Sequence, residues 1–218
     1  MASISKVSSF SICDVTVSKI IKNKQGGNTA YININGKKIV IQGPQMYSPF
    51  GLSEYATEQG PKYSLDLSFI DKDDNEKVAE FYKFCKDLDE FMINYAHSKS
   101  VEWFGKQQAL EVIKEFYRPL VKQGKPKKDN SGSQYPDTIK FKLRTLNDTL
   151  NVKMYDTQRN ELSVEDPIMP GSKIRCIFEI SPVWFINKKN FGVTFNCIQM
   201  EISKPNKIEG FCFIDEDD

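Results

Sequence analysis

Hydrophobic and polar residues alternate along both ends of the chain with a period of two residues. This spacing is typical of β-strands that bury one face. In 138–145, Ile139, Phe141 and Leu143 share one side of the predicted strand, and in 62–70 Tyr63, Leu65, Leu67 and Phe69 do the same. The pattern predicts strands over 10–21, 29–42, 62–70, 138–145, 149–155, 172–181 and 191–202.

Turn signals separate these segments. Asn35-Gly36 supplies the two positive-φ positions of a type I′ hairpin turn, which predicts a tight reversal there. Asn147-Asp148, Pro170-Gly171 and 187–190 predict further turns. The proline and glycine content of 44–61 predicts a long loop before the strand at 62–70.

In the middle of the chain the hydrophobic period changes to that of an amphipathic helix. Apolar residues recur three and four positions apart over 75–95, and Asp74 or Asn75 can cap the start of this helix. A second helix is predicted over 106–117, limited by Pro119. The segment 121–137 has the composition of a mobile basic loop.

Strands, then helices, then strands again predict a mainly β fold. Five or more short strands with a helix in mid-chain suit an oligonucleotide/oligosaccharide-binding (OB) barrel, whose helix conventionally follows the third strand. Other barrels and open α+β sheets share the pattern and remain alternatives. We predict a single OB-fold domain over 1–208, with a helical insertion over about 75–118 and the basic loop 121–137, followed by a short acidic tail over 209–218.

The net charge of the 218-residue chain is only +1, yet the charges are unevenly distributed. Between Arg118 and Arg144 there are eight basic residues against two acidic ones, whereas the last ten residues hold five acidic and no basic residues. Near-neutrality therefore conceals a basic centre and an acidic end.

The sequence offers little for catalysis, cofactors or metals. Its five cysteines form no CxxC pair, which predicts reduced and mostly buried thiols, and His97 is the only histidine. Phosphate-binding glycine motifs are absent, and the carboxylate clusters suit solvated surfaces. We therefore expect no enzymatic activity, no catalytic residue, no cofactor and no metal. With no long apolar stretch and a polar start, we also expect no membrane association and a cytosolic location.

The strand 138–145 carries the strongest binding signal. Its alternation places Lys140, Lys142 and Arg144 on the solvent face, spaced roughly 6.6 Å apart, near the repeat of a nucleic-acid backbone. An ordinary solvated sheet face is the alternative interpretation. Three lysines in the preceding segment, Lys125, Lys127 and Lys128, favour phosphate binding instead.

Aromatic residues that could stack on bases lie near further lysines. Trp184 and Phe185 end a strand and precede Lys188 and Lys189 in a turn. Adjacent strand residues point to opposite faces, so at most one of the two aromatics is buried; Trp184 is the first candidate for a base platform, with burial in the core as the alternative. The aromatics of the predicted loop could contact nucleic acid or cover a barrel end; they are Tyr47, Phe50 and Tyr55.

The tail combines aromatic and acidic residues, which suits either a docking peptide or a solubilising end. The candidate docking residues are Phe211, Phe213, Asp215, Glu216, Asp217 and Asp218.

Three segments, 62–69, 139–145 and above all 166–201, together resemble the single-stranded DNA-binding proteins of T-odd coliphages and their relatives in nucleocytoplasmic large DNA viruses. The matching motifs are Asp166-Pro167-Ile168, Pro170-Gly171-Ser172-Lys173 and Pro182 to Trp184, and the 43–55 loop resembles the viral branch. The tryptophan segment is one residue longer here, so either Trp184 or Phe185 could occupy the stacking position. The tail ends in Asp218 rather than in an aromatic residue.

The resemblance implies an OB fold, binding of single strands during DNA replication, recombination or repair, and a tail that contacts a viral DNA polymerase, helicase or primase. It further implies a viral replication site in the host cytoplasm, with the nucleus or the virion as alternatives. We therefore expect a non-enzymatic protein that binds single-stranded DNA without sequence specificity, as a monomer or a homo-oligomer. The rival interpretation is a structural or adaptor protein of the virion or replication complex that uses its barrel for protein contacts.

Overall fold

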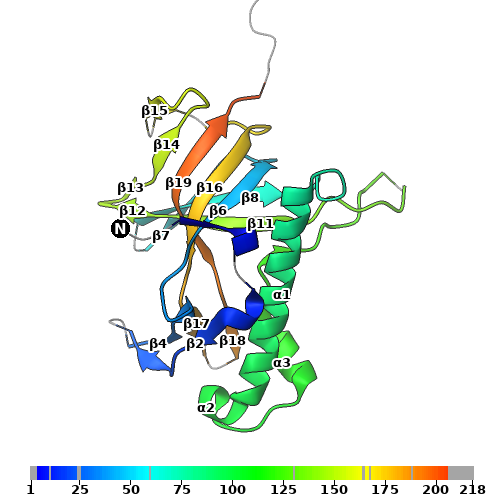
Figure 1. Cartoon of the computed structure of the whole chain (residues 1–218), viewed down its shortest axis with the longest axis vertical. Coiled ribbons are helices and arrows are strands. Elements are labelled where there is room, and N and C mark those ends of the chain that lie inside the picture. Colours follow the sequence, from blue (N-terminus) through cyan, green and yellow to red (C-terminus); the bar gives the residue numbers. More distant parts are fainter. Residues whose placement is uncertain are drawn as a thin grey trace, which may run out of the picture.

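Five strands of the computed structural model form a closed barrel, labelled in the upper half of Figure 1. The structure describes residues 4–9, 11–23, 26–58, 60–129, 131–163, 165–166, 168–187 and 189–205. The barrel strands are β6 (Val40–Tyr47), β8 (Gly60–Ser68), β11 (Thr138–Leu143), β16 (Lys173–Ile180) and β19 (Phe195–Ser203).

These strands follow the order β6, β8, β11, β19, β16 around the barrel before returning to β6. The β11–β19 pair is parallel and closes the sheet, while the other four pairs are antiparallel. A closed five-stranded barrel in which the last strand lies between the third and the fourth is the OB fold, as the sequence predicts.

Aromatic rings fill the interior of the barrel. Phe178 and Phe195 stack with their ring centroids 4.5 Å apart, and Phe141 lies 5.2 Å from Phe178. Ile139 and Leu143 point inward beside Phe141, which confirms the predicted alternation of this strand. Because successive strand residues point to opposite faces, Lys140 and Lys142 lie on the outside, and Arg144, directly after the end of β11, is exposed as well.

The long helix α1 (Glu76–Ser98) packs against the barrel through Phe81, whose ring lies 5.7 Å from that of Phe178. Asn75 caps its first turn by accepting hydrogen bonds from the backbone N–H groups of Lys77 and Val78. The helix follows the second barrel strand, whereas in the conventional OB fold it follows the third.

Two short helices follow α1, which corrects the single predicted helix over 106–117. They are α2 (Ser100–Phe104) and α3 (Leu110–Phe116). Gly105 ends α2 with a φ of +84°, a conformation that costs a glycine little, and the chain re-enters a helix only at Leu110. Among the described residues, no helix is long and apolar enough to cross a membrane.

A second sheet packs on these helices at the lower end of the molecule (Figure 1). Its strands, in spatial order, are β3 (Ile21–Lys22), β4 (Asn28–Ala30), β17 (Val183–Ile186), β18 (Asn190–Gly192) and β9 (Tyr117–Arg118). The predicted strand 191–202 is thus divided between β18 and β19. Ser181 and Thr194 join the two sheets, because the Ser181 N–H donates to the Thr194 carbonyl at 2.8 Å.

Short strands and turns complete the fold. The φ angles of Asn35 and Gly36 are +49° and +70°, and those of Asn147 and Asp148 are +50° and +60°, which confirms both predicted turns. The predicted strand 10–21 forms only short pieces. The remaining elements are β1 (Ile4–Lys6), η1 (Val7–Ser9), η2 (Ile12–Asp14), β2 (Val15–Val17), β5 (Ile32–Ile34), β7 (Leu52–Thr57), β10 (Val121–Lys122), β12 (Thr145–Leu146), β13 (Thr149–Leu150), β14 (Lys153–Tyr155) and β15 (Glu161–Leu162).

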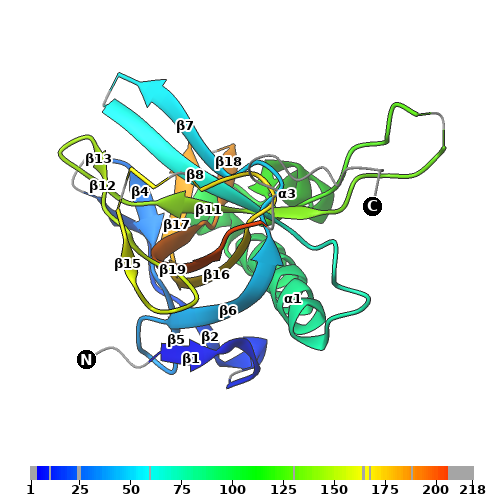
Figure 2. The same ribbon diagram turned by 90° about the horizontal axis from the view of Figure 1, so that it is seen from above.

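The loop predicted over 44–61 is wrong, because β6 continues to Tyr47 and β7 pairs with β8 along its whole length. The β6–β16 register shifts around Gly43 and Pro44, and this irregularity accommodates a proline that cannot donate a hydrogen bond. Strand β7 lies at the edge of the sheet and projects with β8 beyond the barrel (Figure 2).

The basic segment 121–137, here called the basic arm, is a paired extension rather than the expected mobile loop. The Lys127 N–H donates to the Ser133 carbonyl at 2.8 Å, and the Tyr135 N–H donates to the Lys125 carbonyl at 2.9 Å. The arm projects away from the barrel in Figures 1 and 2.

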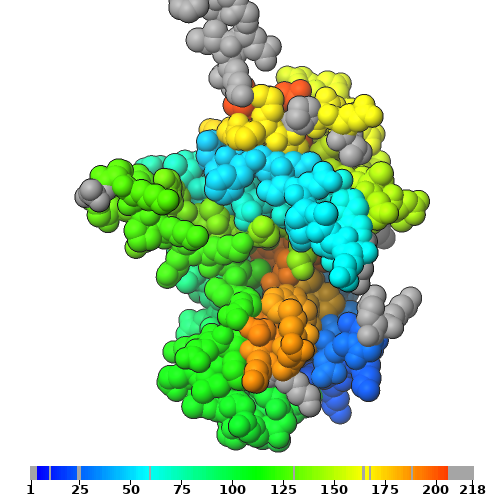
Figure 3. Space-filling view, turned by 180° about the vertical axis from the view of Figure 1, so that it is seen from behind, coloured from blue at the N-terminus to red at the C-terminus, as the bar shows by residue number. Residues whose placement is uncertain are grey.

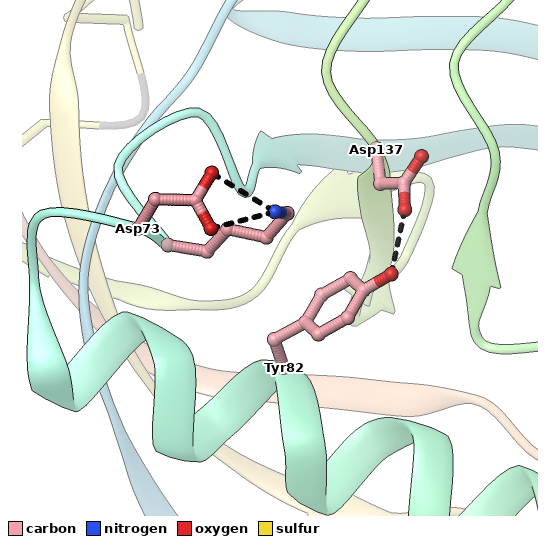
Figure 4. A network of polar contacts seen from close by, with 4 residues as sticks. Asp73, Tyr82 and Asp137 are labelled. Carbon is pink, nitrogen blue, oxygen red and sulfur yellow. Dashed lines mark hydrogen bonds and ion pairs between the residues drawn. The ribbon is translucent and has the colours of Figure 1, made fainter.

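Asp137 connects the base of the arm to α1 through hydrogen bonds. It accepts a hydrogen bond from the Tyr82 hydroxyl at 2.8 Å and one from the Gly124 N–H at 3.0 Å. Figure 4 shows the first of these contacts, beside the ion pair of Lys72 with Asp73. Burial and the hydrogen bond to Asp137 raise the pKa of Tyr82 to about 12.

Candidate nucleic-acid interface

A groove with a volume of about 350 Å³ lies where the barrel passes into the second sheet. In Figure 3 this junction is seen between the cyan β7–β8 hairpin above and the orange β17–β18 strands below, and the surface is hollowed there. The groove combines one cation and two aromatic rings with hydroxyl and amide groups. It is lined by Asn23, Thr29, Tyr31, Lys142, Ser181, Pro182, Trp184, Thr194 and Asn196.

Trp184 is held in the groove by its neighbours on the second sheet. Its Nε1–H donates a hydrogen bond to the Thr194 hydroxyl at 3.1 Å. The indole lies over Gly192, since a Cβ at that position would come within 2.7 Å of the Trp184 Cζ2 atom. The ring is half-buried and lies outside the hydrophobic core, so it can offer surface to a ligand.

Phe185 points the opposite way, into the core of the second sheet. Its ring lies 5.0 Å from that of Trp103, edge to face, and 6.3 Å from that of Phe191. Of the two residues predicted to stack on bases, the structure therefore leaves Trp184 at the groove and gives Phe185 a packing role, because adjacent strand residues face opposite sides.

Tyr31 contributes the second aromatic ring of the groove, and sequence reasoning missed it. The residue lies between β4 and β5. Its N–H donates to the Ser18 hydroxyl at 2.9 Å, and its carbonyl accepts from the Ser18 N–H at 2.9 Å. Its side chain is 48% exposed, although it is flanked by buried Ala30 and Ile32. The alternation of 29–34 could have indicated an outward tyrosine.

The three cations Lys140, Lys142 and Arg144, here called the cationic stripe, differ in their surroundings. Lys140 forms an ion pair with Asp66 at 3.2 Å, and Arg144 forms one with Glu179. Within the described part of the chain, Lys142 pairs with no carboxylate. It lies between Ser64 on β8 and Asn196 on β19, facing the groove. Burial and the nearby charge of Lys62 lower the pKa of Lys142, which reflects an ammonium without a compensating anion.

Glu179 is only 8% exposed and binds two cations, Arg144 and, at 2.6 Å, Lys38. Burial raises the pKa of this carboxyl, but the hydrogen bonds from Lys38 and Arg144 outweigh that effect and lower it overall. Arg144 is thus committed to stabilising a nearly buried anion, which leaves Lys142 as the member of the stripe with charge available to a ligand.

The remaining predicted cations lie away from the groove lining. The three on the basic arm, Lys125, Lys127 and Lys128, are exposed. The Lys127 ammonium lies 5.9 Å from the ring centroid of Tyr135. Lys189 is exposed in the β17–β18 turn. Lys188 lies outside the described residues, as do the predicted docking residues Phe211, Phe213, Asp215, Glu216, Asp217 and Asp218.

The loop aromatics occupy different surroundings. Phe50 and Tyr55 are exposed, whereas Tyr47 is half-buried at the end of β6. Tyr55 lies opposite Lys62 in the β7–β8 hairpin. The thiols of Cys85, Cys176 and Cys197 are buried and that of Cys13 is exposed, and all four are free of disulfides. Among the described residues, no three metal-ligating side chains gather.

Comparison with known proteins places the chain in a family. A family model described as "Family of unknown function (DUF5871)" matches residues 66–215, more than half of the chain. The chain belongs to the DUF5871 family. Residues 66–215 include Lys142, Trp184 and Asn196 but not Tyr31. No curated protein matches the sequence.

Solved structures similar to this DUF5871 member include single-stranded DNA-binding proteins of bacteriophages. One is gp2.5 of bacteriophage T7, with a TM-score of 0.47 and 12% identity, covering 78% of this chain and 93% of that chain. Another is the protein of bacteriophage Enc34, with a TM-score of 0.47 and 17% identity, covering 92% and 98%. Its complex with single-stranded DNA gives a TM-score of 0.46 and 17% identity, covering 88% and 99%. These three structures do not represent the large DNA viruses, and that branch stays a prediction.

Proposed function

We propose that this protein binds single-stranded DNA without catalysing a reaction, on the groove and the adjoining outer face of β8, β11 and β19. The observation that carries the proposal is the meeting of Lys142 with Trp184 and Tyr31 in one groove, although these residues come from distant parts of the sequence. Stacking on an aromatic ring holds a base of any kind, and a lysine beside it holds a phosphate. Stacking of this kind requires a base that is not already stacked in a duplex, which favours single strands.

Further cations extend the surface along the barrel face. Lys122 on β10 lies 3.8 Å from Asp66, the same carboxylate that Lys140 contacts. Lys122 and Lys140 thus connect β11 with the basic arm. The exposed lysines of the arm and Tyr135 again combine cations with an aromatic ring. The proposed path runs from the arm, past Lys142, to Trp184.

Roles in viral replication, recombination or repair belong to the same proposal and rest on the sequence resemblance. The proposed site of action, in the host cytoplasm, nucleus or virion, rests on the same resemblance. The proposed docking of a polymerase, helicase or primase on the acidic tail also rests on it. The rival function, an adaptor that binds only proteins, predicts no affinity for oligonucleotides at any salt concentration.

Replacing Lys142 by alanine is expected to weaken binding and to reduce the slope of log affinity against log salt by roughly 0.7, the value for one lost phosphate contact with a single strand. The matched control replaces Lys83 by methionine together with Asp87 by asparagine, an exposed ion pair on α1. This double substitution removes an existing ion pair without changing the local net charge, and it lies away from the proposed path, so it should leave the slope unchanged. Anisotropy titrations of a labelled oligothymidylate over a salt series measure both. Equal slopes in the Lys142 variant and the parent would remove Lys142 from the interface.

A further inference from the structure

Most polar groups that line the groove are already committed to the protein. The Thr29 hydroxyl donates to the Val183 carbonyl at 3.0 Å, and the Thr194 hydroxyl accepts from Trp184. The Ser181 hydroxyl donates to the Pro182 carbonyl at 3.0 Å and accepts from the Thr194 N–H at 2.9 Å. These groups fix the walls of the groove, and their main hydrogen-bonding capacity is used.

Asn196 is different. Its side chain lines the groove, and in the part of the chain that the structure describes its carboxamide forms no hydrogen bond with the protein. Strand β19 holds it directly beside Lys142 of β11 on one side and Glu179 of β16 on the other. A carboxamide presents one donor and one acceptor side by side in a fixed plane, which is the pattern needed to pair with the edge of a base.

Resting on the proposed function, we infer that the groove takes one unstacked base and that Asn196 pairs with the edge of that base. Trp184 and Tyr31 supply the apolar surfaces, and the volume of about 350 Å³ lies near the lower end of the range for small-ligand pockets. Binding is therefore selective at one position of the strand, although the rest of the interface reads only phosphates and ring faces.

Lys142 determines which bases are favoured. Its ammonium carries donors only, so next to Asn196 it adds a partner for a carbonyl oxygen on the base. Thymine and guanine offer a carbonyl oxygen beside an N–H, and they can satisfy both side chains. Adenine pairs with a carboxamide through its amino group and one ring nitrogen, whose single lone pair Asn196 then uses, so that edge keeps no second acceptor for Lys142. The groove should discriminate against adenine.

The test uses short oligothymidylates in which a single deoxyadenosine is moved along the strand, so that stacking between adenines does not contribute. With the parent protein, at least one position of the adenine is expected to weaken binding about fivefold or more, since a good bidentate contact discriminates by ~1–3 kcal/mol. Asn196→Leu should level the scan to within about twofold. Asn196→Thr, which suits a strand, repeats the test if the leucine variant melts early, and Asn94→Leu on the exposed face of α1 is the matched control.

The outcomes separate the two claims. A flat scan with the parent protein, or an adenine penalty that both folded Asn196 variants keep, would overturn the role of Asn196 while the binding itself stands. Failure of the parent protein to bind unmodified oligothymidylate would instead overturn the proposed function.

Discussion

Replacing Trp184 by alanine is expected to weaken the binding of single-stranded DNA by about 1–3 kcal/mol, the contribution of one base stacked on an aromatic ring. The indole lies at the groove, over Gly192 and outside the hydrophobic core, so its loss should remove a ligand contact and cost little stability. Anisotropy titration with a labelled oligothymidylate measures the affinity, and thermal unfolding measures the stability.

Two further variants make this experiment decisive. Phe185→Ala changes the adjacent residue, whose ring packs against Trp103, and should lower the melting temperature far more than Trp184→Ala does. Gly192→Ala forces the Trp184 ring from its place without removing any group proposed to touch DNA, and should reproduce part of the affinity loss. A Trp184→Ala protein that melts early but binds DNA as the parent does would make this residue part of the core.

Replacing Asp89 by alanine is expected to lower the free energy of unfolding by about 2–5 kcal/mol, because it leaves buried donors without an acceptor. Asp89 is 5% exposed on α1 and accepts hydrogen bonds from the Tyr117 hydroxyl at 2.6 Å and the Leu120 N–H at 2.9 Å. It thereby fixes β9 and the start of the basic arm to the helix. Urea denaturation followed by circular dichroism measures the change.

The pKa of Asp89 provides an independent check. Burial raises this pKa, and the hydrogen bonds from Leu120 and Tyr117 counteract only part of that shift. When the pKa of a carboxyl is higher in the folded protein than in the unfolded chain, the free energy of unfolding falls as the pH rises from the unfolded pKa to the folded one. In the Asp89→Asn variant this part of the pH dependence should disappear. A loss of stability below about 0.5 kcal/mol in Asp89→Ala would show that other groups satisfy these donors.

The sequence predicts the barrel well where alternation is strict. Ile139, Phe141 and Leu143 fill the interior as expected, because the period of two in a strand determines which side chains share a face. It fails over 44–61, where proline and glycine indicate a loop but a bulge and an edge strand accommodate them. Local composition does not reveal such tertiary compensation.

The candidate site could be predicted only in part, for a related reason. Lys142 and Trp184 were recognisable as a candidate phosphate ligand and a candidate base platform, yet the ion pairs that neutralise Lys140 and Arg144 depend on cross-strand register between residues far apart in sequence. Register follows from the assembled sheet rather than from any single strand. Tyr31 and Asn196 join the groove in the same way, through contacts that only the folded chain creates.

The central claim, binding of single-stranded DNA at the groove, is tested most directly by one titration. Labelled single- and double-stranded oligonucleotides of the same length are titrated at two salt concentrations, with tryptophan fluorescence recorded alongside anisotropy. Trp103 is buried, so a change in fluorescence on binding reports on Trp184, the second of the two tryptophans. We expect tighter binding of the single strand, weaker binding at higher salt and quenching of the fluorescence. Equal or tighter binding of the duplex, or no binding of the single strand at low salt, would contradict the account.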